Sequence, residues 1–151
     1  MSRRFLLDTN IISNMMRDAN GIAAQRFAQI AKEFESSDVC TSVVVQCELR
    51  FGLTRKSHPR LELAYERVMQ SLEILPLGSE VADCYAQLRT ALEQQGTPIG
   101  PNDTLIAAHA LALDCTLVTD NEAEFRRVPG LRVENWLKEE VVKEVAQVGP
   151  K

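Results

Sequence analysis

The stretch Phe5-Leu6-Leu7-Asp8-Thr9-Asn10 decides how this chain folds. Its three apolar residues predict a short buried strand, which ends abruptly at a carboxylate, a hydroxyl and an amide. In open α/β sheets, ligands bind in the crevice just beyond the carboxyl ends of the strands. We therefore expect Asp8 to stand in such a crevice, with the rest of the chain built around this strand.

The composition is that of an ordinary globular domain. The chain has 151 residues, of which 45% are hydrophobic and 25% charged. We expect a single domain over residues 1–140 and a C-terminal tail over residues 141–151. No apolar run approaches the roughly 20 residues needed to cross a membrane. We therefore expect a cytoplasmic protein without a membrane partner.

Cysteine, histidine and net charge limit the chemistry that is available. The four cysteines form no C-x-x-C pair and lie in apolar segments, so we expect buried, reduced thiols. Two histidines leave little material for a histidine-based metal site or triad. The net charge of -4 is unusual for a protein that binds nucleic acid. A metal site made of acids would account for part of that charge.

Apolar periodicity predicts alternating strands and helices. After the first strand, we expect strands at 39–41, 73–77, 115–119 and 131–133, and helices at 22–36, 43–55, 61–72, 79–95 and 102–113. Residues 11–18 are expected as a short helix or loop, and 136–148 as a peripheral helix or tail. Ser79 and Asn102 are expected N-caps, and Gly96 an expected helix stop. This alternation predicts an α/β fold, with helices on both faces of a mainly parallel sheet.

Four acidic residues have separate reasons to point at one place. Asp8 and Asp120 each follow a predicted strand. Glu48 and Asp103 lie three and four residues from apolar residues of their helices, so both are expected to face inward. The apolar stripe beside Glu48 is expected to include Phe51. Four like charges in one crevice raise one another's pKa values, and a hard cation removes that penalty. Oxygen ligands without histidine or cysteine favour Mg²⁺ or Mn²⁺ over Zn²⁺.

Such a site suits the cleavage of a phosphodiester bond. We expect Asp8 and Asp103 to bind the metal directly, and Asp120 to bind it through water or to complete a second site. Glu48 is expected to be a further ligand or a base that orients the attacking water. A bound metal lowers the pKa of that water and stabilises charge on the phosphate.

Residues next to these acids are expected to support them. Thr9 and Thr119 are placed to hold the carboxylates or a water, and Asn10 either does the same or only caps the following helix. Glu124 is an additional candidate, although a surface position explains it as well. The candidates for phosphate contacts follow Glu48 on or near one helix, where a solvated helix face is the alternative: Arg50, Arg55 and Lys56.

Four blocks of the sequence resemble the signature motifs of PIN domains, and more narrowly those of VapC toxins from bacterial toxin–antitoxin modules. The blocks are Leu-Asp-Thr-Asn at 7–10, Ser42 with Glu48-Leu49 and Gly52, Asp-Thr-Leu-Ile-Ala-Ala at 103–108, and Leu-Val-Thr-Asp at 117–120. The similarity spans residues 4–136. It implies an α/β/α sandwich with a mainly parallel five-stranded sheet.

The same resemblance implies a function. VapC toxins of type II toxin–antitoxin systems are Mg²⁺- or Mn²⁺-dependent endoribonucleases, often act on tRNA, are inhibited by a small VapB-like antitoxin and frequently form homodimers. The family's acids carry over to Asp8, Glu48, Asp103 and Asp120. The fourth position is often asparagine in relatives, and the usual Asp before Phe125 is here Glu124.

Three other functions remain open on the sequence. A haloacid-dehalogenase-type phosphatase would need a second Asp two residues after Asp8, where Asn10 stands. A phospho-receiver signalling domain should carry a lysine just after a later strand, and none follows Thr119. A non-catalytic RNA-binding PIN module would have no need of all four acids.

Overall fold

Five parallel strands form the centre of the molecule. The computed structural model describes residues 4–33, 38–56 and 58–138. The strands are β1 (Arg4–Leu7), β2 (Val39–Ser42), β3 (Glu73–Leu75), β4 (Cys115–Val118) and β5 (Val133–Glu134). They lie in the order β3-β2-β1-β4-β5, and every pairing is parallel. The predicted parallel sheet is confirmed, and the first strand of the chain is its central strand.

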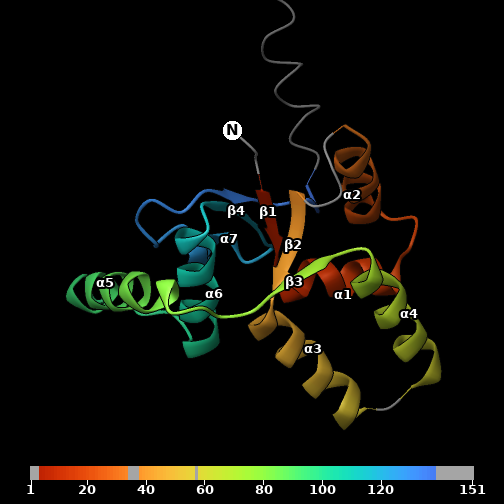
Figure 1. The fold of residues 1–151 in the computed structure, drawn as a ribbon, viewed down its shortest axis with the longest axis horizontal. Helices are drawn as coiled ribbons and strands as arrows, with labels where there is room; N and C mark the ends of the chain where they lie inside the picture. Colours follow the sequence, from red (N-terminus) through yellow and green to blue (C-terminus); the bar gives the residue numbers. More distant parts are fainter. Residues whose placement is uncertain (1–3, 34–37, 57, 139–151) are drawn as a thin grey trace, which may run out of the picture.

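Helices cover both faces of this sheet (Figure 1). They are α1 (Thr9–Arg17), α2 (Ile22–Glu33), α3 (Val43–Arg55), α4 (Pro59–Gln70), α5 (Glu80–Gln94), α6 (Pro101–Ala112) and α7 (Glu122–Phe125). In Figure 1, α1, α2 and α4 lie to the right of the sheet, and α5 and α6 lie to its left. The predicted α/β/α sandwich is therefore confirmed. None of the described helices is long and apolar enough to span a membrane.

Cover on both faces explains why the central strand is a continuous apolar run rather than an alternating one. Phe5, Leu6 and Leu7 are at most 2% exposed. The Phe5 ring packs against Trp136, with their centroids 5.6 Å apart. Burying each such side chain stabilises the fold by roughly 1.5–3 kcal/mol. Trp136 thus holds the end of the described chain against the central strand.

The ends of two helices differ in part from the caps that the sequence predicts. α6 begins at Pro101, whose fixed φ suits the first helical position, so Gly100 rather than Asn102 occupies the N-cap position. Ser79 does occupy the N-cap position of α5, but its side chain makes no capping hydrogen bond. Gly96 has a φ of 72°, which confirms it as the stop after α5.

Strand ends and two side chains also differ from expectation. β3 ends at Leu75, because Pro76 has no N–H to continue the ladder. β5 covers residues 133–134 instead of 131–133. Phe51 is 64% exposed and is not part of the core. All four cysteines are free thiols, but only Cys40 and Cys115 are buried, whereas Cys84 is half-buried and Cys47 is exposed.

The C-terminal predictions are only partly covered by the structure. Residues 136–138 form a turn and a bend, not the first residues of a helix. The rest of the expected segment 136–148, together with the expected tail 141–151, lies outside the described residues.

The strand order places a crevice beside Asp8. From β1, the chain continues to β2 and β3 on one side and then crosses to β4 and β5 on the other. A switch of this kind opens a crevice at the carboxyl ends of the two strands that flank it. The Asp8 N–H donates to the Val118 carbonyl at 2.9 Å. The residues that follow β1 and β4 therefore begin side by side.

Candidate active site

Asp8 lies at the bottom of this crevice and is only 3% exposed. Its Oδ1 accepts the Thr9 N–H at 2.8 Å, and its Oδ2 accepts the Thr119 hydroxyl at 2.8 Å and the Asn10 amide at 3.3 Å. Burial raises the pKa of Asp8, and the charge of Glu48 adds to that effect, although the three hydrogen bonds oppose it. Asp8 is thus a fixed carboxylate whose ionised form is disfavoured.

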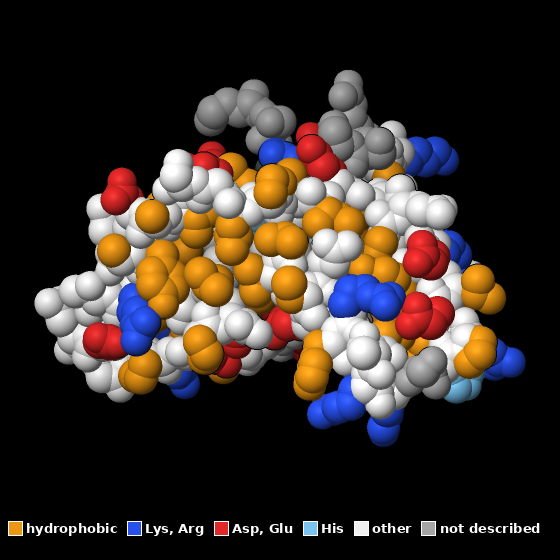
Figure 2. All heavy atoms as spheres, turned by 60° about the horizontal axis from the view of Figure 1, so that its bottom comes forward, with side chains coloured by type: hydrophobic (Ala, Val, Ile, Leu, Met, Phe, Trp, Pro, Cys, Tyr) orange, Lys and Arg blue, Asp and Glu red, His pale blue; other side chains and the backbone are white. Residues whose placement is uncertain are grey.

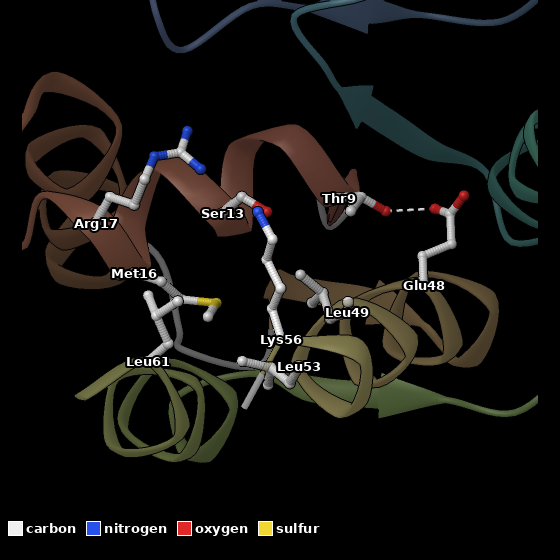
Figure 3. Close-up of a pocket in the computed structure, with 10 residues that line it drawn as sticks. Thr9, Ser13, Met16, Arg17, Glu48, Leu49, Leu53, Lys56 and Leu61 are labelled. Carbon is white, nitrogen blue, oxygen red and sulfur yellow. Dashed lines mark hydrogen bonds between the residues drawn. The ribbon is translucent and has the colours of Figure 1, made fainter. Parts of the chain in front are cut away.

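Glu48 faces Asp8 from α3. That helix starts directly after β2, where the Ser42 hydroxyl accepts the Val44 N–H at 3.0 Å and caps it. The Thr9 hydroxyl donates to Glu48 Oε1, as Figure 3 shows. The Asn102 amide donates to Glu48 Oε2 at 3.3 Å. Groups from α1 and α6 therefore hold both oxygens of this half-buried carboxylate.

Asp103, in the first turn of α6, carries the most perturbed carboxyl of the crevice. Burial raises its pKa to about 7, with further contributions from the charges of Asp8, Glu124 and Glu48 and from a hydrogen bond with Glu124. The structure therefore brings together three of the acids that the sequence singled out, from three separate segments of the chain.

Glu124 joins these acids and forms a pair with Asp103. Its Oε1 accepts the Gly100 N–H at 3.0 Å, and its Oε2 accepts the Asn121 amide at 2.6 Å. Burial raises the pKa of Glu124, but these bonds and the one with Asp103 outweigh burial, so the pKa lies below its usual value. Asp103 is therefore the partner that holds the proton.

Asp120 occupies the rim of the crevice instead of its interior. Its side chain is exposed, and Oδ1 accepts the Asn135 amide at 3.0 Å. Its N–H donates to Asn10 Oδ1 at 2.9 Å. The neighbouring charges that act most on Asp103 are those of Asp8, Glu124 and Glu48. Asp120 thus borders the other acids and is turned toward the chain after β5.

Sequence reasoning missed the residues that hold this rim. Asn135 is 3% exposed and donates to Glu122 at 2.9 Å as well as to Asp120. Bonds from Lys138, Asn135 and Arg126 lower the pKa of Glu122 to about 2. No local signal marks Asn135, because its role depends on β5 lying beside β4. The position of Asn102 next to Asp103 was a signal for the site, but the sequence pattern predicted only a helix cap there.

The donor set of the crevice fits a hard divalent cation. Asp8, Glu48, Asp103 and Glu124 offer only carboxylate oxygens, and no cationic side chain of the described residues bonds to them. Among the described residues, no three histidine, cysteine, aspartate or glutamate side chains are already gathered into a metal site. A bound cation would offset the burial and repulsion that raise the pKa values of Asp8 and Asp103. Oxygen donors alone suit Mg²⁺ or Mn²⁺.

Comparison with known proteins settles which family the chain belongs to. The PIN domain family model matches residues 5–131. The chain is 36% identical to ribonuclease VapC2 of Rickettsia felis over 135 residues, which cover 89% of this chain and 98% of the relative. It is 34% identical to the tRNA(fMet)-specific endonuclease VapC of Salmonella typhimurium over 134 residues, covering 88% and 98% of the two chains. The chain belongs to the PIN-domain family.

Solved structures agree with this assignment. VapBC2 from Rickettsia felis, bound to a DNA fragment from its promoter, matches with a TM-score of 0.80 at 34% identity, covering 87% of this chain and 98% of that one. DNA-bound VapBC from Salmonella typhimurium matches with a TM-score of 0.80 at 32% identity, over 89% and 98% of the two chains. Within its family, this PIN domain groups with the VapC ribonucleases, which sets the phosphatase and receiver alternatives aside.

A groove leads away from the acids of this PIN domain (Figure 3). It has a volume of about 240 Å³ and lies between α1, α3 and α4. Thr9 and Glu48 line the end next to the crevice, and Arg17 and Lys56 line the remainder together with apolar residues: Met16, Leu49, Leu53 and Leu61. The groove is therefore apolar along its walls, acidic at one end and basic at the other.

The predicted phosphate-binding residues of the PIN domain have different surroundings. Arg50 forms an ion pair with Glu62 at 3.1 Å and lies over the Tyr65 ring, 5.3 Å from its centroid. Arg55 lies over the exposed ring of Phe51 at 5.2 Å. In the described part of the chain, neither Arg55 nor Lys56 pairs with a carboxylate. Arg50 is thus held within the fold, and the other two are the cations left for a ligand.

Proposed function

We propose that this VapC-type PIN domain is the endoribonuclease toxin of a type II toxin–antitoxin system and cleaves RNA, tRNA in particular, with a Mg²⁺- or Mn²⁺-activated water. One observation carries the proposal. Acids from the end of β1, from α3 and from α6 converge on one crevice that contains only oxygen ligands. The relatives support it, because they are named ribonuclease or tRNA(fMet)-specific endonuclease.

We infer the part of each residue of the crevice from its described contacts. Asp8 and Asp103 would hold the metal, with Asp8 fixed by Thr119 and Asn10. Once bound, a divalent ion lowers the pKa of its water and stabilises charge on the phosphate. Glu48 orients the attacking water and accepts its proton.

The remaining residues act on these acids. Thr9 and Asn102 keep both oxygens of Glu48 in a defined orientation. Glu124 holds the Asp103 carboxyl through their shared hydrogen bond. Asp120, on the rim, would hold the metal through a water molecule. Losing any direct ligand should remove charge stabilisation from the transition state.

Cleavage of tRNA tests the reaction. Wild type and Asp103→Ala are incubated with total tRNA, with and without Mg²⁺, and new RNA ends are mapped. We expect defined ends only with wild type and metal. Asp83→Ala is the matched control, since Asp83 is also a first-turn acid, but on the exposed face of α5. Near-wild-type cleavage by folded Asp103→Ala protein would overturn the mechanism.

Thermal unfolding tests the metal independently of the reaction. Binding to the native state stabilises it by mass action. Millimolar Mg²⁺ or Mn²⁺ should therefore raise the Tm of metal-free protein, and Asp8→Asn should weaken that effect. An unchanged Tm with both ions would argue against a metal in the crevice.

The partner of this toxin is proposed to be a VapB-like antitoxin. The similar solved structures are VapBC complexes, which supports this choice. The groove between α1, α3 and α4 offers apolar walls of the kind that receive an amphipathic helix. An arginine of the antitoxin would pair with the acids at the end of the groove. The homodimer implied by the resemblance stays a prediction.

A further inference from the structure

An exposed aromatic ring stands close to the acidic crevice. Phe51 is 64% exposed, although burial of such a ring is normally favourable. The Arg55 guanidinium lies over this ring, 5.2 Å from its centroid. A second pair, Arg50 of α3 over Tyr65 of α4, is built into the fold, because Tyr65 is 5% exposed and Arg50 binds Glu62. Of the two rings that lie beside these arginines, only the Phe51 ring is exposed to solvent.

Helix geometry places this pair in line with the crevice. Glu48, Phe51 and Arg55 are spaced by three and four residues, so their side chains share one face of α3. At a rise of about 1.5 Å per residue, Arg55 lies roughly 10 Å along the helix axis from Glu48. Figure 2 shows acidic side chains in a recess at the lower middle of the surface and basic side chains farther along its lower edge. The face therefore presents a carboxylate, an aromatic ring and a cation in that order.

This order matches the groups of an RNA strand. A base stacks on an aromatic ring whatever its identity, and an arginine binds phosphate or stacks on a base. A base can stack in this way only when it is unpaired, as in a loop or a single strand. A strand whose scissile phosphate lies at the acids would have a neighbouring base at Phe51 and a phosphate farther along at Arg55.

The surroundings of Phe51 favour RNA over a protein helix. An amphipathic helix needs a continuous apolar surface. On its face of α3, however, Phe51 stands between Glu48 and Arg55, and Gly52 beside it has no side chain. The other large exposed hydrophobic residues of the described chain lie on other elements: Leu63 on α4 and Leu77 after β3. The face offers one ring and a positive charge, which complement a base and a phosphate.

We propose that Phe51 and Arg55 form a nucleotide platform, which binds an unpaired base of the RNA substrate and its adjoining phosphate beside the crevice. The inference rests on the proposed function and specifies its substrate as a single-stranded segment. The platform positions the strand and takes no part in bond cleavage. Its loss should therefore act on RNA affinity and KM far more than on the cleavage rate of bound RNA.

Binding and cleavage are measured separately on the full chain. A labelled single-stranded RNA oligonucleotide is titrated in EDTA, where no metal-dependent cleavage occurs, and tRNA cleavage is measured with Mg²⁺. Stacking is worth about 1–3 kcal/mol per base, so Phe51→Ala should raise Kd and KM roughly 5- to 150-fold. Phe51→Leu should do nearly the same, because it keeps the hydrophobicity but loses the π face, whereas Phe51→Trp should bind at least as well as wild type.

Two further variants define the platform. Leu63→Ala removes an apolar side chain of α4 that is even more exposed, at 72%, and should leave both Kd and KM unchanged. Arg55→Gln removes one phosphate contact and should reduce the slope of log K against log salt by about 0.7. A Kd and KM of Phe51→Ala equal to those of wild type would overturn the platform.

The outcomes separate the platform from the function on which it rests. If wild type cleaves RNA and Phe51→Ala behaves identically, only the platform fails. If no RNA is cleaved but single-stranded RNA binding depends on Phe51, only the nuclease function fails. If Phe51→Ala weakens binding of a VapB-like protein and leaves the RNA Kd unchanged, the ring belongs to a protein interface and the platform is wrong.

Discussion

At the scale of single residues, repulsion among carboxylates is the main feature of the crevice. Asp103 shows it most clearly, because burial and three neighbouring acids raise its pKa to about 7. In the absence of a cation, these clustered charges therefore lower the stability of the folded protein. Such groups are typical of functional sites rather than of structural ones.

Asp103→Asn should stabilise the metal-free protein at neutral and alkaline pH. The folded-state pKa of Asp103, about 7, lies above the value of 3.8 for an unperturbed carboxyl. The folded state consequently binds the proton more tightly, and ionisation lowers stability as pH rises from about 4 to 7. We expect a gain on the order of 1 kcal/mol above pH 7, since water screens a half-buried carboxylate, and none near pH 4. Urea unfolding in EDTA at both pH values measures it, and a gain that is equal at both would contradict this explanation.

The positions of Glu124 and Asp120 reverse the ranking that the sequence predicts for them. Glu124 bonds Asp103 inside the crevice, whereas Asp120 bonds Asn135 at the rim. We therefore expect Glu124→Gln to lower the single-turnover cleavage rate more than Asp120→Asn does, by roughly tenfold or more, which corresponds to about 1.4 kcal/mol of transition-state stabilisation. Each variant serves as the isosteric control of the other. A larger loss for Asp120→Asn would place the rim acid at the reacting phosphate.

The sequence predicted the acids whose side-chain direction depends only on the strand or helix that carries them. Asp8 follows a strand, and the inward direction of Glu48 and Asp103 follows from helical spacing. The sequence offered Glu124 only as an additional candidate, because its contact with the crevice depends on a bond to the Gly100 N–H from a distant loop. The outward turn of Asp120 was not visible, since Asn135 lies beside it only through the pairing of β4 with β5.

At the scale of elements, two helices carry the acids and one buried bond joins them. α3 bears Glu48 and α6 bears Asp103. His109 on α6 is fully buried, and its Nδ1 lies 2.8 Å from the Ser42 hydroxyl that caps α3. Periodicity predicted both helices, but not this bond, which depends on how α6 packs against α3.

His109→Gln should flatten the loss of stability at acid pH. Burial lowers the pKa of His109 below the ordinary value of 6.5, although Glu80 and the Pro76 carbonyl oppose the shift. The unfolded chain therefore binds a proton that the folded chain does not, and stability falls as pH drops below about 6.5. Glutamine stays neutral and removes this contribution. Urea unfolding from pH 7.5 to 5 should show a shallower decline for the variant than for wild type, and parallel curves would show that His109 is not the group responsible.

At the scale of the whole molecule, the strand order accounts for both the crevice and the groove. β1 in the centre brings Asp8 to the switch between the two halves of the sheet. The chain that follows forms α1, which builds one wall of the groove opposite α3 and α4. The alternation of strands and helices was enough to predict the sandwich. The order of the strands, and hence the groove, follows from long-range packing that no short stretch of sequence specifies.

The groove can be closed at one position without disturbing the fold. Gly52 lines it, and a Cβ added there meets no atom within 4 Å. Gly52→Trp should therefore fill the groove and weaken binding of the VapB-like antitoxin roughly tenfold or more, a cost of about 1.4 kcal/mol or more for the displaced helix. Gly52→Ala is the control for the backbone, because it should stabilise α3 by about 1 kcal/mol and leave the groove open.

Measurements of antitoxin affinity and of cell growth test the effect of Gly52→Trp. The antitoxin is titrated into each purified toxin, and each toxin is expressed with and without the antitoxin. Wild type and Gly52→Ala should arrest growth alone and be rescued by co-expression. Gly52→Trp, with its Tm and tRNA cleavage measured in parallel, should arrest growth in both cases, because a filled groove excludes the helix that brings an arginine to the acids. Equal affinity and equal rescue for all three proteins would place the antitoxin on another surface.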